Sequence, residues 1–232
     1  MFVDAQNLTK SYVAGDVRTA ALKNASLSLG EGEIGVILGP SGSGKSTLMN
    51  ILGGIDRADS GAAFVGGEDI TLLNDDALTE YRRAKIGFIF QSYNLIPHLT
   101  ALENIEVIEN ISKSPLNIPD VLEAVGLSEK KDRFPRELSG GEQQRVAIAR
   151  AIVKNPALLL CDELTGALDF ENAIGVLSLI QNINKKFGAT ILIITHNSAI
   201  CAMADRVFRL RSGEVAESYV NDSPIDAARI EW

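Results

Sequence analysis

The chain has 232 residues, 46% of them hydrophobic and 22% charged, which is typical of a globular domain large enough to bury a core. The formal net charge of −8 argues against nucleic acid as a ligand, because binding a phosphate backbone needs clustered positive charge. The N-terminal residues lack the pattern of a secretory signal, and the apolar runs are far shorter than a spanning helix, so we expect no membrane segment.

Apolar runs predict two groups of strands. Three early runs suggest an antiparallel flanking sheet: Val3–Leu8, Ala20–Leu29 and Ala62–Val65. Three others are continuously apolar, which implies burial on both faces of a parallel α/β sheet: Ile34–Leu38, Ala157–Cys161 and Thr190–Thr195. Each of these three runs ends at a polar cluster. The clusters lie at the carboxyl ends of the strands, where open α/β sheets bind ligands.

The first polar cluster is a glycine-rich loop that leads into a predicted helix over Lys45–Gly53. The loop consists of Gly39, Pro40, Ser41, Gly42, Ser43, Gly44, Lys45, Ser46 and Thr47, and its first eight residues have the pattern G-x-x-x-x-G-K-[ST]. Its glycines allow backbone N–H groups to turn inward around phosphate oxygens. Lys45 supplies a positive charge to the β- and γ-phosphates, and Ser46 supplies a hydroxyl to Mg²⁺. The expected ligands are therefore a nucleoside triphosphate and Mg²⁺.

Residues 92–155 have a helical, turn-rich pattern with repeated prolines, which indicates an inserted helical subdomain. It contains the octapeptide Leu138–Arg145, Leu-Ser-Gly-Gly-Glu-Gln-Gln-Arg, which leads into a predicted helix over Glu142–Lys154. Ser139, Gly140 and Gly141 would open this helix, so that their N–H groups and the helix dipole face an anion. The alternative is a Ser-Gly-Gly turn that only caps a helix, but it leaves the rest of the octapeptide unexplained.

Asp162 and Glu163 follow the second of the three core strands. Phosphoryl transfer uses one carboxylate on the metal and one beside the attacking water, so the pair suits that chemistry. By itself the pair is a weak signal, since acidic residues often end strands, and it gains weight from the phosphate loop. Cys161 and Cys201 lack metal-ligand spacing and lie in apolar surroundings, which predicts two buried free thiols.

The last quarter of the chain follows the third core strand. Ser198–Ala204 is expected to form a helix, and Val207–Leu210 and Glu214–Ser218 are expected to form a terminal hairpin. The sequence indicates no chemical role for the tail Val220–Trp232.

The phosphate loop, the octapeptide and the acidic pair together resemble the motifs of the ATP-binding-cassette (ABC) ATPases, and the resemblance extends over about Phe2–Glu217. It implies an α/β P-loop NTPase core with a mostly parallel sheet, an N-terminal antiparallel β-subdomain and an inserted α-helical subdomain. Residues 1–232 then form a single ABC ATPase domain. Within it, 1–91 and 156–218 are the nucleotide-binding core with the β-subdomain, 92–155 the helical signature subdomain and 219–232 a C-terminal tail.

The resemblance implies ATP and Mg²⁺ as cofactors and suggests a role for individual residues. Tyr12 matches the aromatic residue that stacks on adenine, although the sequence alone would favour an ordinary exposed or core tyrosine. Gln91 matches the glutamine that touches Mg²⁺ and the nucleophilic water. Asp162 matches the aspartate that holds Mg²⁺, Glu163 the general base and His196 the histidine that contacts the γ-phosphate.

Two further matches imply a subunit interface. The octapeptide matches the family's signature motif, so Ser139, Gly140 and Gly141 would bind the γ-phosphate of ATP held by a partner subunit. The segment Gly166–Asp169, Gly-Ala-Leu-Asp, matches the D-loop, which crosses the dimer interface. Each chain would then carry two half-sites, and a head-to-tail homodimer is expected. The second histidine, His98, is expected at the surface of a loop.

The segment Phe90–Asn104, with Leu52–Asp56 and the D-loop, is similar to one branch of the family, the ATPases of the macrolide-exporter and lipoprotein-release type. These ATPases serve FtsX-like membrane permeases in export, extraction or antimicrobial-peptide resistance. The resemblance implies a permease partner that docks near Gln91–Leu102 and a peripheral location at the cytoplasmic face of the membrane.

Other classes compete with this interpretation. An ATPase that drives a wall enzyme or a sensor without moving a solute would have the same cassette, and an importer ATPase fits the segment Gln91–Asn104 less well. ABC ATPases of DNA repair usually have long insertions between the phosphate loop and the signature, and translation-associated ones have two cassettes in one chain; this chain has neither. The sequence does not specify the substrate, the direction of transport or the permease.

Overall fold

The computed structural model describes residues 1–166 and 168–231. A six-stranded sheet with the order β10-β9-β3-β8-β7-β6 lies at its centre. Its strands are β3 (Ile34–Leu38), β6 (Ile86–Ile89), β7 (Leu158–Asp162), β8 (Thr190–Thr195), β9 (Arg206–Arg211) and β10 (Glu214–Val220). Neighbouring strands are parallel except β9 and β10, which form the predicted terminal hairpin. The expected mostly parallel α/β sheet is therefore confirmed.

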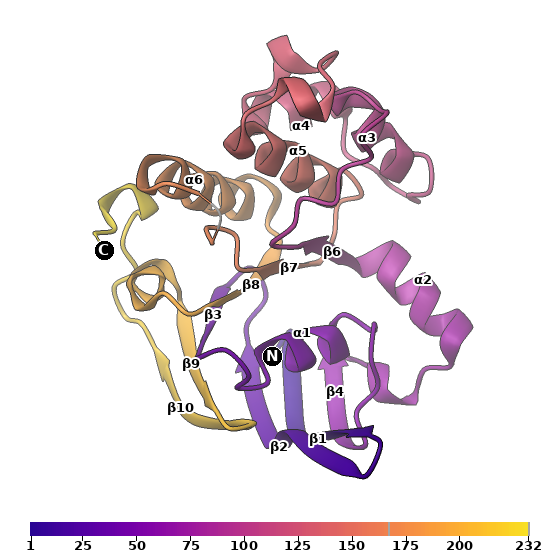
Figure 1. The fold of residues 1–232 in the computed structure, drawn as a ribbon, viewed down its shortest axis with the longest axis vertical. Helices are drawn as coiled ribbons and strands as arrows, with labels where there is room; N and C mark the ends of the chain where they lie inside the picture. Colours follow the sequence, from indigo (N-terminus) through magenta and orange to yellow (C-terminus); the bar gives the residue numbers. More distant parts are fainter. Residues whose placement is uncertain (167, 232) are drawn as a thin grey trace.

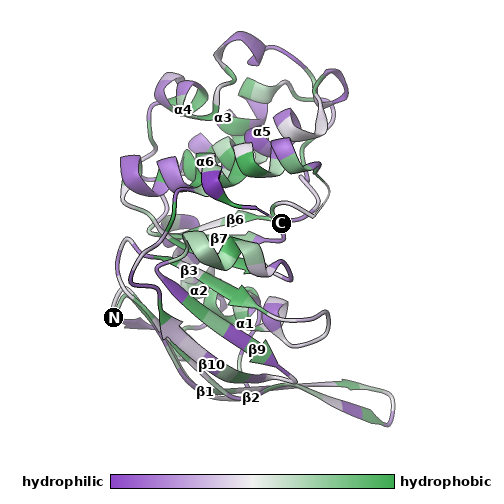
Figure 2. Cartoon of the chain, turned by 90° about the vertical axis from the view of Figure 1, so that its left-hand side faces the viewer, coloured by the Kyte–Doolittle hydropathy of each residue, from purple (hydrophilic) through white to green (hydrophobic). Residues whose placement is uncertain are grey.

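Helices cover both faces of this sheet (Figures 1 and 2). On one face lie α1 (Lys45–Leu52) and α2 (Asp75–Lys85), and on the other lie α5 (Gly140–Ile152) and α6 (Phe170–Phe187). Two further helices pack around α5, namely α3 (Ala101–Glu109) and α4 (Ile118–Val125). The chain also has 3₁₀ helices: η1 (Ile70–Leu72), η2 (Ser128–Lys130), η3 (Pro135–Glu137), η4 (Ser198–Met203) and η5 (Ala227–Arg229).

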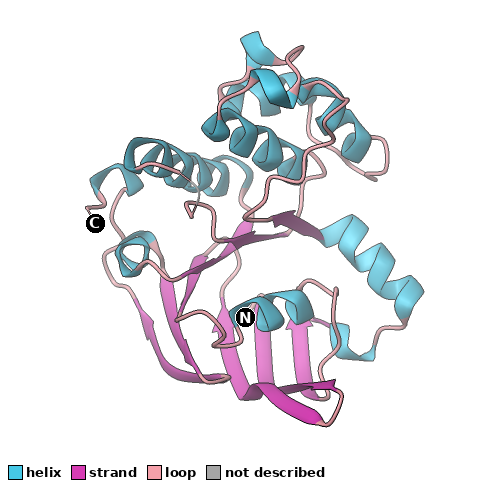
Figure 3. Cartoon of the chain, in the orientation of Figure 1, coloured by secondary structure: helices cyan, strands magenta, loops and turns pink. Residues whose placement is uncertain are grey.

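A second, antiparallel sheet with the order β2-β1-β4-β5 lies beneath α1 (Figure 3). Its strands are β1 (Val3–Ala14), β2 (Val17–Leu29), β4 (Ser60–Val65) and β5 (Glu68–Asp69). β1 and β2 are longer than the predicted runs because their outer ends pair as a hairpin that reaches Ala14 and Val17. These ends are exposed to solvent. Because they have no buried face, their sequence shows no apolar pattern.

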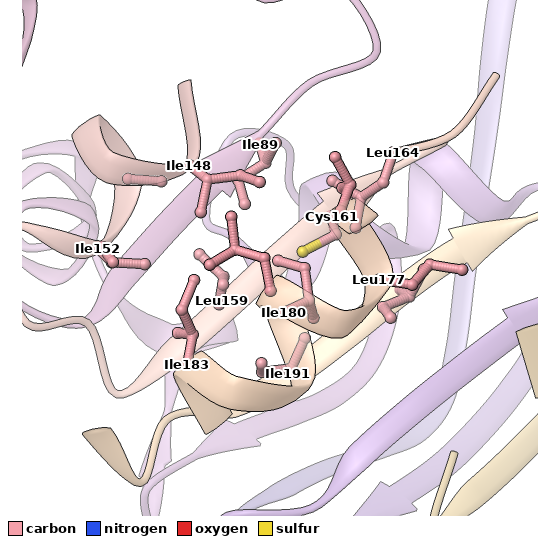
Figure 4. Packing of buried hydrophobic residues seen from close by; sticks show 14 of the residues in the cluster. Ile89, Ile148, Ile152, Leu159, Cys161, Leu164, Leu177, Ile180, Ile183 and Ile191 are labelled. Atoms are coloured by element: carbon pink, nitrogen blue, oxygen red, sulfur yellow. The ribbon is translucent and has the colours of Figure 1, made fainter. Parts of the chain in front are cut away.

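Burial on both faces explains the unbroken apolar sequences of the core strands. Alternate side chains of a strand point to opposite faces of a sheet. In β8, Ile191 and Ile193 therefore join the hydrophobic cluster under α5 and α6, whereas Leu192 and Ile194 join the cluster that contains α1 and β1. Figure 4 shows part of the first cluster, in which α5 and α6 contact β7 and β8 through isoleucine and leucine side chains. Cys161 lies inside this cluster, and both cysteines are buried and free, as predicted.

The predicted helices differ from the structure in their limits or type. The helix predicted over Lys45–Gly53 ends at Leu52, and the one predicted over Glu142–Lys154 ends at Ile152. The helix predicted over Glu142–Lys154 begins two residues earlier, at Gly140, because the Ser139 side chain caps it. The predicted helix over Ser198–Ala204 is the 3₁₀ helix η4, which the side chain of Asn197 caps. Helices α3, α4 and α5 all lie within residues 92–155, and the boundaries of a helical subdomain there stay a prediction.

The C-terminal tail packs against α6. Ala227 and Ile230 are buried in the same cluster as the core strands. The side chain of Gln181 on α6 donates to the carbonyl of Ile225 at 3.1 Å and accepts from the amide of Ala227 at 3.1 Å. The tail therefore stabilises the fold, a role that the sequence did not indicate.

Within the described residues, no helix is both long and apolar enough to cross a bilayer.

Candidate functional site

The glycine-rich loop lies between β3 and α1, at the carboxyl ends of the parallel strands (Figure 1). Gly42 and Gly44 have φ angles of 75° and 101°, in the left-handed region that favours glycine. A Cβ atom on Gly44 would lie 2.3 Å from the carbonyl oxygen of Ala21, so any side chain there would displace β2 or the loop. The glycine pattern thus gives the loop its conformation for both backbone and packing reasons.

Lys45, the first residue of α1, is held inside the loop. Its Nζ donates to the carbonyl oxygens of Gly39 at 2.8 Å and Pro40 at 2.9 Å, and only 7% of the residue is exposed. Among the described residues, no carboxylate lies within ion-pair distance of this ammonium group. A nearly buried positive charge with only carbonyl partners is a favourable feature for binding an anion.

A cavity of 480 Å³ opens above the loop, a size typical of small-molecule sites. It is lined by Tyr12, Thr19, Ala20, Ala21, Ser41, Gly42, Gly44, Lys45, Ser46, Thr47, Gln91, Asp162 and Glu163. The structure therefore brings together most of the predicted site residues from four separate parts of the sequence. Ser43 is a buried residue of the loop, and Gly39 and Pro40 line a neighbouring cavity together with His196.

The structure brings Ser46 and Asp162, the predicted Mg²⁺ ligands, close together. Their Oγ and Oδ2 atoms are 3.5 Å apart, a separation that two ligands of one Mg²⁺ ion at about 2.1 Å allow. Burial, followed by the nearby charge of Glu163, raises the pKa of Asp162 above its usual range. A bound cation would stabilise the charged form of this carboxylate. The described residues contain no cluster of three metal-ligating side chains, and Mg²⁺ is usually bound by one or two carboxylates plus substrate phosphates.

Glu163 has an unusual backbone conformation, with a φ of 46°, which is uncommon for a residue with a side chain. Its amide donates to the carbonyl of Ile194 at 3.0 Å, which fixes this turn to the end of β8. One carboxylate oxygen lies 3.2 Å from Nδ1 of His196. A Cβ built on Gly166 would lie 3.2 Å from Nε2 of Gln91 and 3.6 Å from Oε2 of Glu163, so these two side chains converge on one point.

The signature residues lie outside the cavity. Ser139 is the N-cap of α5: its Oγ accepts from the amide of Glu142 at 3.3 Å, and its amide donates to the Glu142 carboxylate at 2.8 Å. Lys130 forms an ion pair with Glu142 and, with the Ser139 amide, lowers the pKa of that carboxyl. Ser139 and Gly140 are exposed, and none of Ser139, Gly140 and Gly141 lines the cavity over the phosphate loop.

The D-loop is described in part, because Ala167 lies outside the described residues. Asp169 is exposed and caps α6, where its carboxylate accepts from the amide of Asn172 at 2.9 Å and from its side-chain nitrogen at 2.7 Å. These two bonds lower the pKa of Asp169. His98 is exposed in the loop before α3, at the surface as expected.

Sequence reasoning missed the surroundings of Tyr12. The Tyr12 hydroxyl donates to Asp56 at 2.6 Å, and the Lys10 ammonium lies 5.3 Å from the centre of the tyrosine ring. Lys10 and Tyr12 are two positions apart on β1, and this spacing places their side chains on one face of the strand. The sequence could therefore have indicated that these two side chains are neighbours. Nothing local in the sequence connects them to Asp56.

The site consists of a strand, then a glycine-rich loop that holds a lysine, and then a helix, with a pair of carboxylates beside the loop. This arrangement defines the site of a P-loop nucleoside triphosphatase. Comparison with known proteins is consistent with this class. The family model described as "ABC transporter" matches residues 22–166. The chain therefore belongs to the ABC transporter ATPase family, whose ATPase domains bind and hydrolyse ATP with Mg²⁺.

Relatives match nearly the whole chain. A putative ABC transporter ATP-binding protein of Mycoplasma pneumoniae is 43% identical over 99% of this chain and 50% of its own length. The macrolide export ATP-binding/permease protein MacB of Shigella flexneri is 42% identical over 93% of this chain and 34% of its own. The chain thus spans half or less of these two relatives.

The ABC transporter ATP-binding protein MJ0796 of Methanocaldococcus jannaschii is similar in size. It is 41% identical over 92% of this chain and 94% of its own length. A solved dimeric structure of this cassette, in a post-hydrolysis state bound to ADP and Pi, superposes with a TM-score of 0.84 at 39% identity. That structure covers 94% of this chain, and this chain covers 98% of it.

Proposed function

We propose that this chain is the ATPase of an ABC export system and hydrolyses ATP at two composite sites of a head-to-tail dimer. One observation carries the proposal. The cavity over the phosphate loop contains the residues expected to bind adenine, the phosphates and the metal ion. The signature at the start of α5, whose residues Ser139 and Gly140 are exposed, lies outside this cavity. A helix N-terminus whose N-cap serine and first glycine are exposed suits a phosphate supplied by a second subunit.

Within one subunit, the residues divide the work of phosphoryl transfer. Mg²⁺, when bound, neutralises charge on the phosphate oxygens, and Ser46 and Asp162 are the residues that would hold it. Lys45 provides a fixed positive charge at the β- and γ-phosphates. Glu163 accepts the proton of the attacking water on a carboxylate oxygen, and His196, 3.2 Å away, keeps that carboxylate in place. Tyr12, which also lines the cavity, stacks on adenine.

The relatives support the dimer and the export role. The solved cassette from Methanocaldococcus jannaschii is dimeric, and the Shigella protein joins an ATP-binding part to a permease part in one chain. We infer that an FtsX-like permease binds this chain at the cytoplasmic face of the membrane. This partner would couple ATP-driven closing of the dimer to export, extraction or peptide resistance.

The loop between β6 and α3, residues 91–100, is the proposed docking surface for the permease. Asn104, which is fully buried on α3, holds this loop from inside: it accepts from the amide of Ile96 at 2.8 Å and donates to the carbonyl of Leu99 at 3.0 Å. Ile96 itself is 39% exposed. A loop that begins at Gln91 in the nucleotide cavity and presents an apolar side chain outside is suited to transmit the nucleotide state.

The dimer is tested with Glu163→Gln, which removes the proton acceptor and should lower the rate of hydrolysis by about 10²–10⁴. ATP then stays bound, so we expect this variant to be a dimer with Mg²⁺-ATP and a monomer with ADP in light scattering. Adding Ser139→Arg should abolish the dimer and leave ATP affinity unchanged, because Ser139 is not among the residues that line its own cavity.

Thr100→Arg is the matched control. Thr100 caps α3 with the same capping box that Ser139 uses on α5, so both substitutions remove an equivalent cap. Only Ser139→Arg should prevent dimer formation. A Glu163→Gln protein that stays monomeric with saturating ATP, even when reconstituted with its permease, would contradict the composite site.

The permease surface is tested with Ile96→Asp in pull-downs from detergent. The expected result is loss of the permease with ATP affinity unchanged, because the Ile96 side chain does not line the cavity. Equal loss of permease binding and ATP binding would show that the loop has a structural role only.

A further inference from the structure

Three side chains next to the phosphate loop bond to one another. Asp56, in the turn after α1, accepts from the Nζ of Lys10 at 2.7 Å through Oδ1 and from the hydroxyl of Tyr12 at 2.6 Å through Oδ2. The Lys10 Nζ also lies 5.3 Å from the centre of the Tyr12 ring, within the range of a cation–π interaction. The phenol is therefore fixed at its hydroxyl by Asp56 and at its ring by Lys10.

The backbone of β1 and the turn after α1 hold this arrangement in place. The Lys10 Nζ also donates to the carbonyl of Arg57 at 2.7 Å. The amide of Ser11 donates to the side chain of Asp59 at 2.8 Å, and the amide of Asp59 donates to the carbonyl of Thr9 at 2.8 Å. The turn is thus bonded to β1 immediately beside Tyr12, and Asp56 has a defined position relative to the ring.

The three side chains differ in how far they are exposed to solvent. The Lys10 side chain is 13% exposed and that of Asp56 25%, whereas Tyr12 as a whole is 44% exposed and lines the cavity. Burial alone would raise the pKa of Asp56, but the hydrogen bonds from Lys10 and Tyr12 outweigh it and lower this pKa. Burial likewise would lower the pKa of Lys10, but Asp56 raises it above its usual value. Both charges are therefore present at neutral pH, beside a tyrosine that is partly exposed to solvent.

We propose that Lys10 and Asp56 are positioning residues that hold the Tyr12 ring as a preformed platform for the adenine of ATP. The inference rests on the proposed role of Tyr12. An exposed tyrosine without partners would have to lose its freedom of rotation about two bonds when a base stacks on it. In this chain, the hydrogen bond to Asp56 and the contact with Lys10 order the ring before ATP binds.

An ordinary surface ion pair is the simpler alternative. Lys10 and Asp56 would then only tie β1 to the turn after α1, with no effect on the base. The two explanations differ in what they predict for a ligand without adenine. A structural pair that supports the phosphate loop would affect inorganic tripolyphosphate and ATP alike, whereas a platform acts on ATP alone.

The test measures the affinity of the full chain for ATP and for inorganic tripolyphosphate by calorimetry. Tyr12→Ala should weaken ATP binding about two- to tenfold, the range expected for one aromatic stack, and leave tripolyphosphate binding unchanged. Asp56→Asn should weaken ATP binding about two- to fivefold, again without an effect on tripolyphosphate. Lys10→Met provides a second variant with the same expected pattern, should Asp56→Asn fail to fold.

A double variant shows whether Asp56 acts through the ring. In the Tyr12→Ala background, Asp56→Asn should have no further effect on ATP affinity, because the platform is already absent. Glu68→Gln is the matched control: it breaks an ion pair of similar length, 2.8 Å to Lys85, away from the cavity, and should change neither affinity.

The outcomes separate this inference from the proposed function. Equal weakening of ATP and tripolyphosphate by Asp56→Asn, or a further loss in the Tyr12→Ala background, would overturn the positioning role. Weakening by Tyr12→Ala but not by Asp56→Asn or Lys10→Met would also overturn it, and the adenine site would stand. If Tyr12→Ala itself leaves ATP affinity unchanged, the assignment of Tyr12 to adenine is wrong, and the inference falls with it.

Discussion

Replacing Lys45 by methionine removes one positive charge from the floor of the nucleotide cavity and keeps most of the side-chain volume. Among the described residues, this ammonium group donates to the carbonyls of Gly39 and Pro40 alone, at 2.8 and 2.9 Å. Both carbonyls belong to the loop beside the open cavity, where water can replace the lost donor. We therefore expect a cost to folding of only about 1–2 kcal/mol.

The effect on ATP should be much larger. Two unit charges 4 Å apart interact by about 4 kcal/mol at an effective dielectric constant of 20, and by about 1 kcal/mol in bulk water. Lys45 is only 7% exposed, so the first value is closer to its surroundings. About 4 kcal/mol corresponds to nearly three orders of magnitude in affinity. Because the ammonium group must give up part of its bonding to the carbonyls, we expect a loss of about 10²–10³-fold.

Calorimetric titration with Mg²⁺-ATP measures this loss, and thermal unfolding monitors the fold. Lys154→Met is the matched control. Lys154 is also partly buried and also donates to a backbone carbonyl, that of Arg82 at 2.8 Å, but it lies two residues after the end of α5 and does not line the cavity. It should leave ATP affinity within twofold of the unmodified chain. If Lys45→Met binds ATP within threefold of the unmodified chain, the electrostatic reasoning for the phosphate loop is refuted.

Two further predictions concern stability. Burial lowers the pKa of Lys154 from its usual 10.5 to about 8, so the unfolded chain binds more protons between these pH values. The free energy of unfolding contributed by this group should therefore rise between pH 8 and pH 10.5, by at most about 3 kcal/mol, and urea unfolding of Lys154→Met should show no such rise. Ile230→Ala, at a position that is 3% exposed, should lower the free energy of unfolding by about 2–4 kcal/mol. Val220→Ala, at a position that is 52% exposed, should change it little. Equal effects of the two substitutions would refute the conclusion that the packing of the tail stabilises the fold.

The parts of the fold that follow from neighbouring residues were predicted from the sequence. The core strands β3 and β8 have the predicted ends, because burial on both faces leaves a continuous apolar run. The phosphate loop is contiguous, and its glycines set the local backbone at Gly42 and Gly44. The cap of α5 is local too, because Ser139, the residue before the helix, bonds to Glu142 three positions later. The helix was nevertheless predicted to begin at Glu142, two residues after its actual start.

Other features left no local pattern. The outer ends of β1 and β2 are exposed, so their pairing depends on each other and not on a buried face. The tail depends on Gln181, which is 44 and 46 residues from its two hydrogen-bond partners. The left-handed backbone of Glu163 is fixed by its amide bond to the end of β8, another contact distant in sequence.

For the site, the sequence by itself determined the phosphate loop and, through the resemblance to ABC ATPases, which residues to expect around it. The tertiary structure decided how they meet. Ser46 and Asp162 are 116 residues apart and come together only because β3 and β7 both flank β8. Lys10, Tyr12 and Asp56 meet because the turn after α1 packs on β1. The signature lies outside its own cavity because α5 covers the face of the sheet opposite α1, an arrangement set by the packing of two hydrophobic clusters and encoded in no single segment.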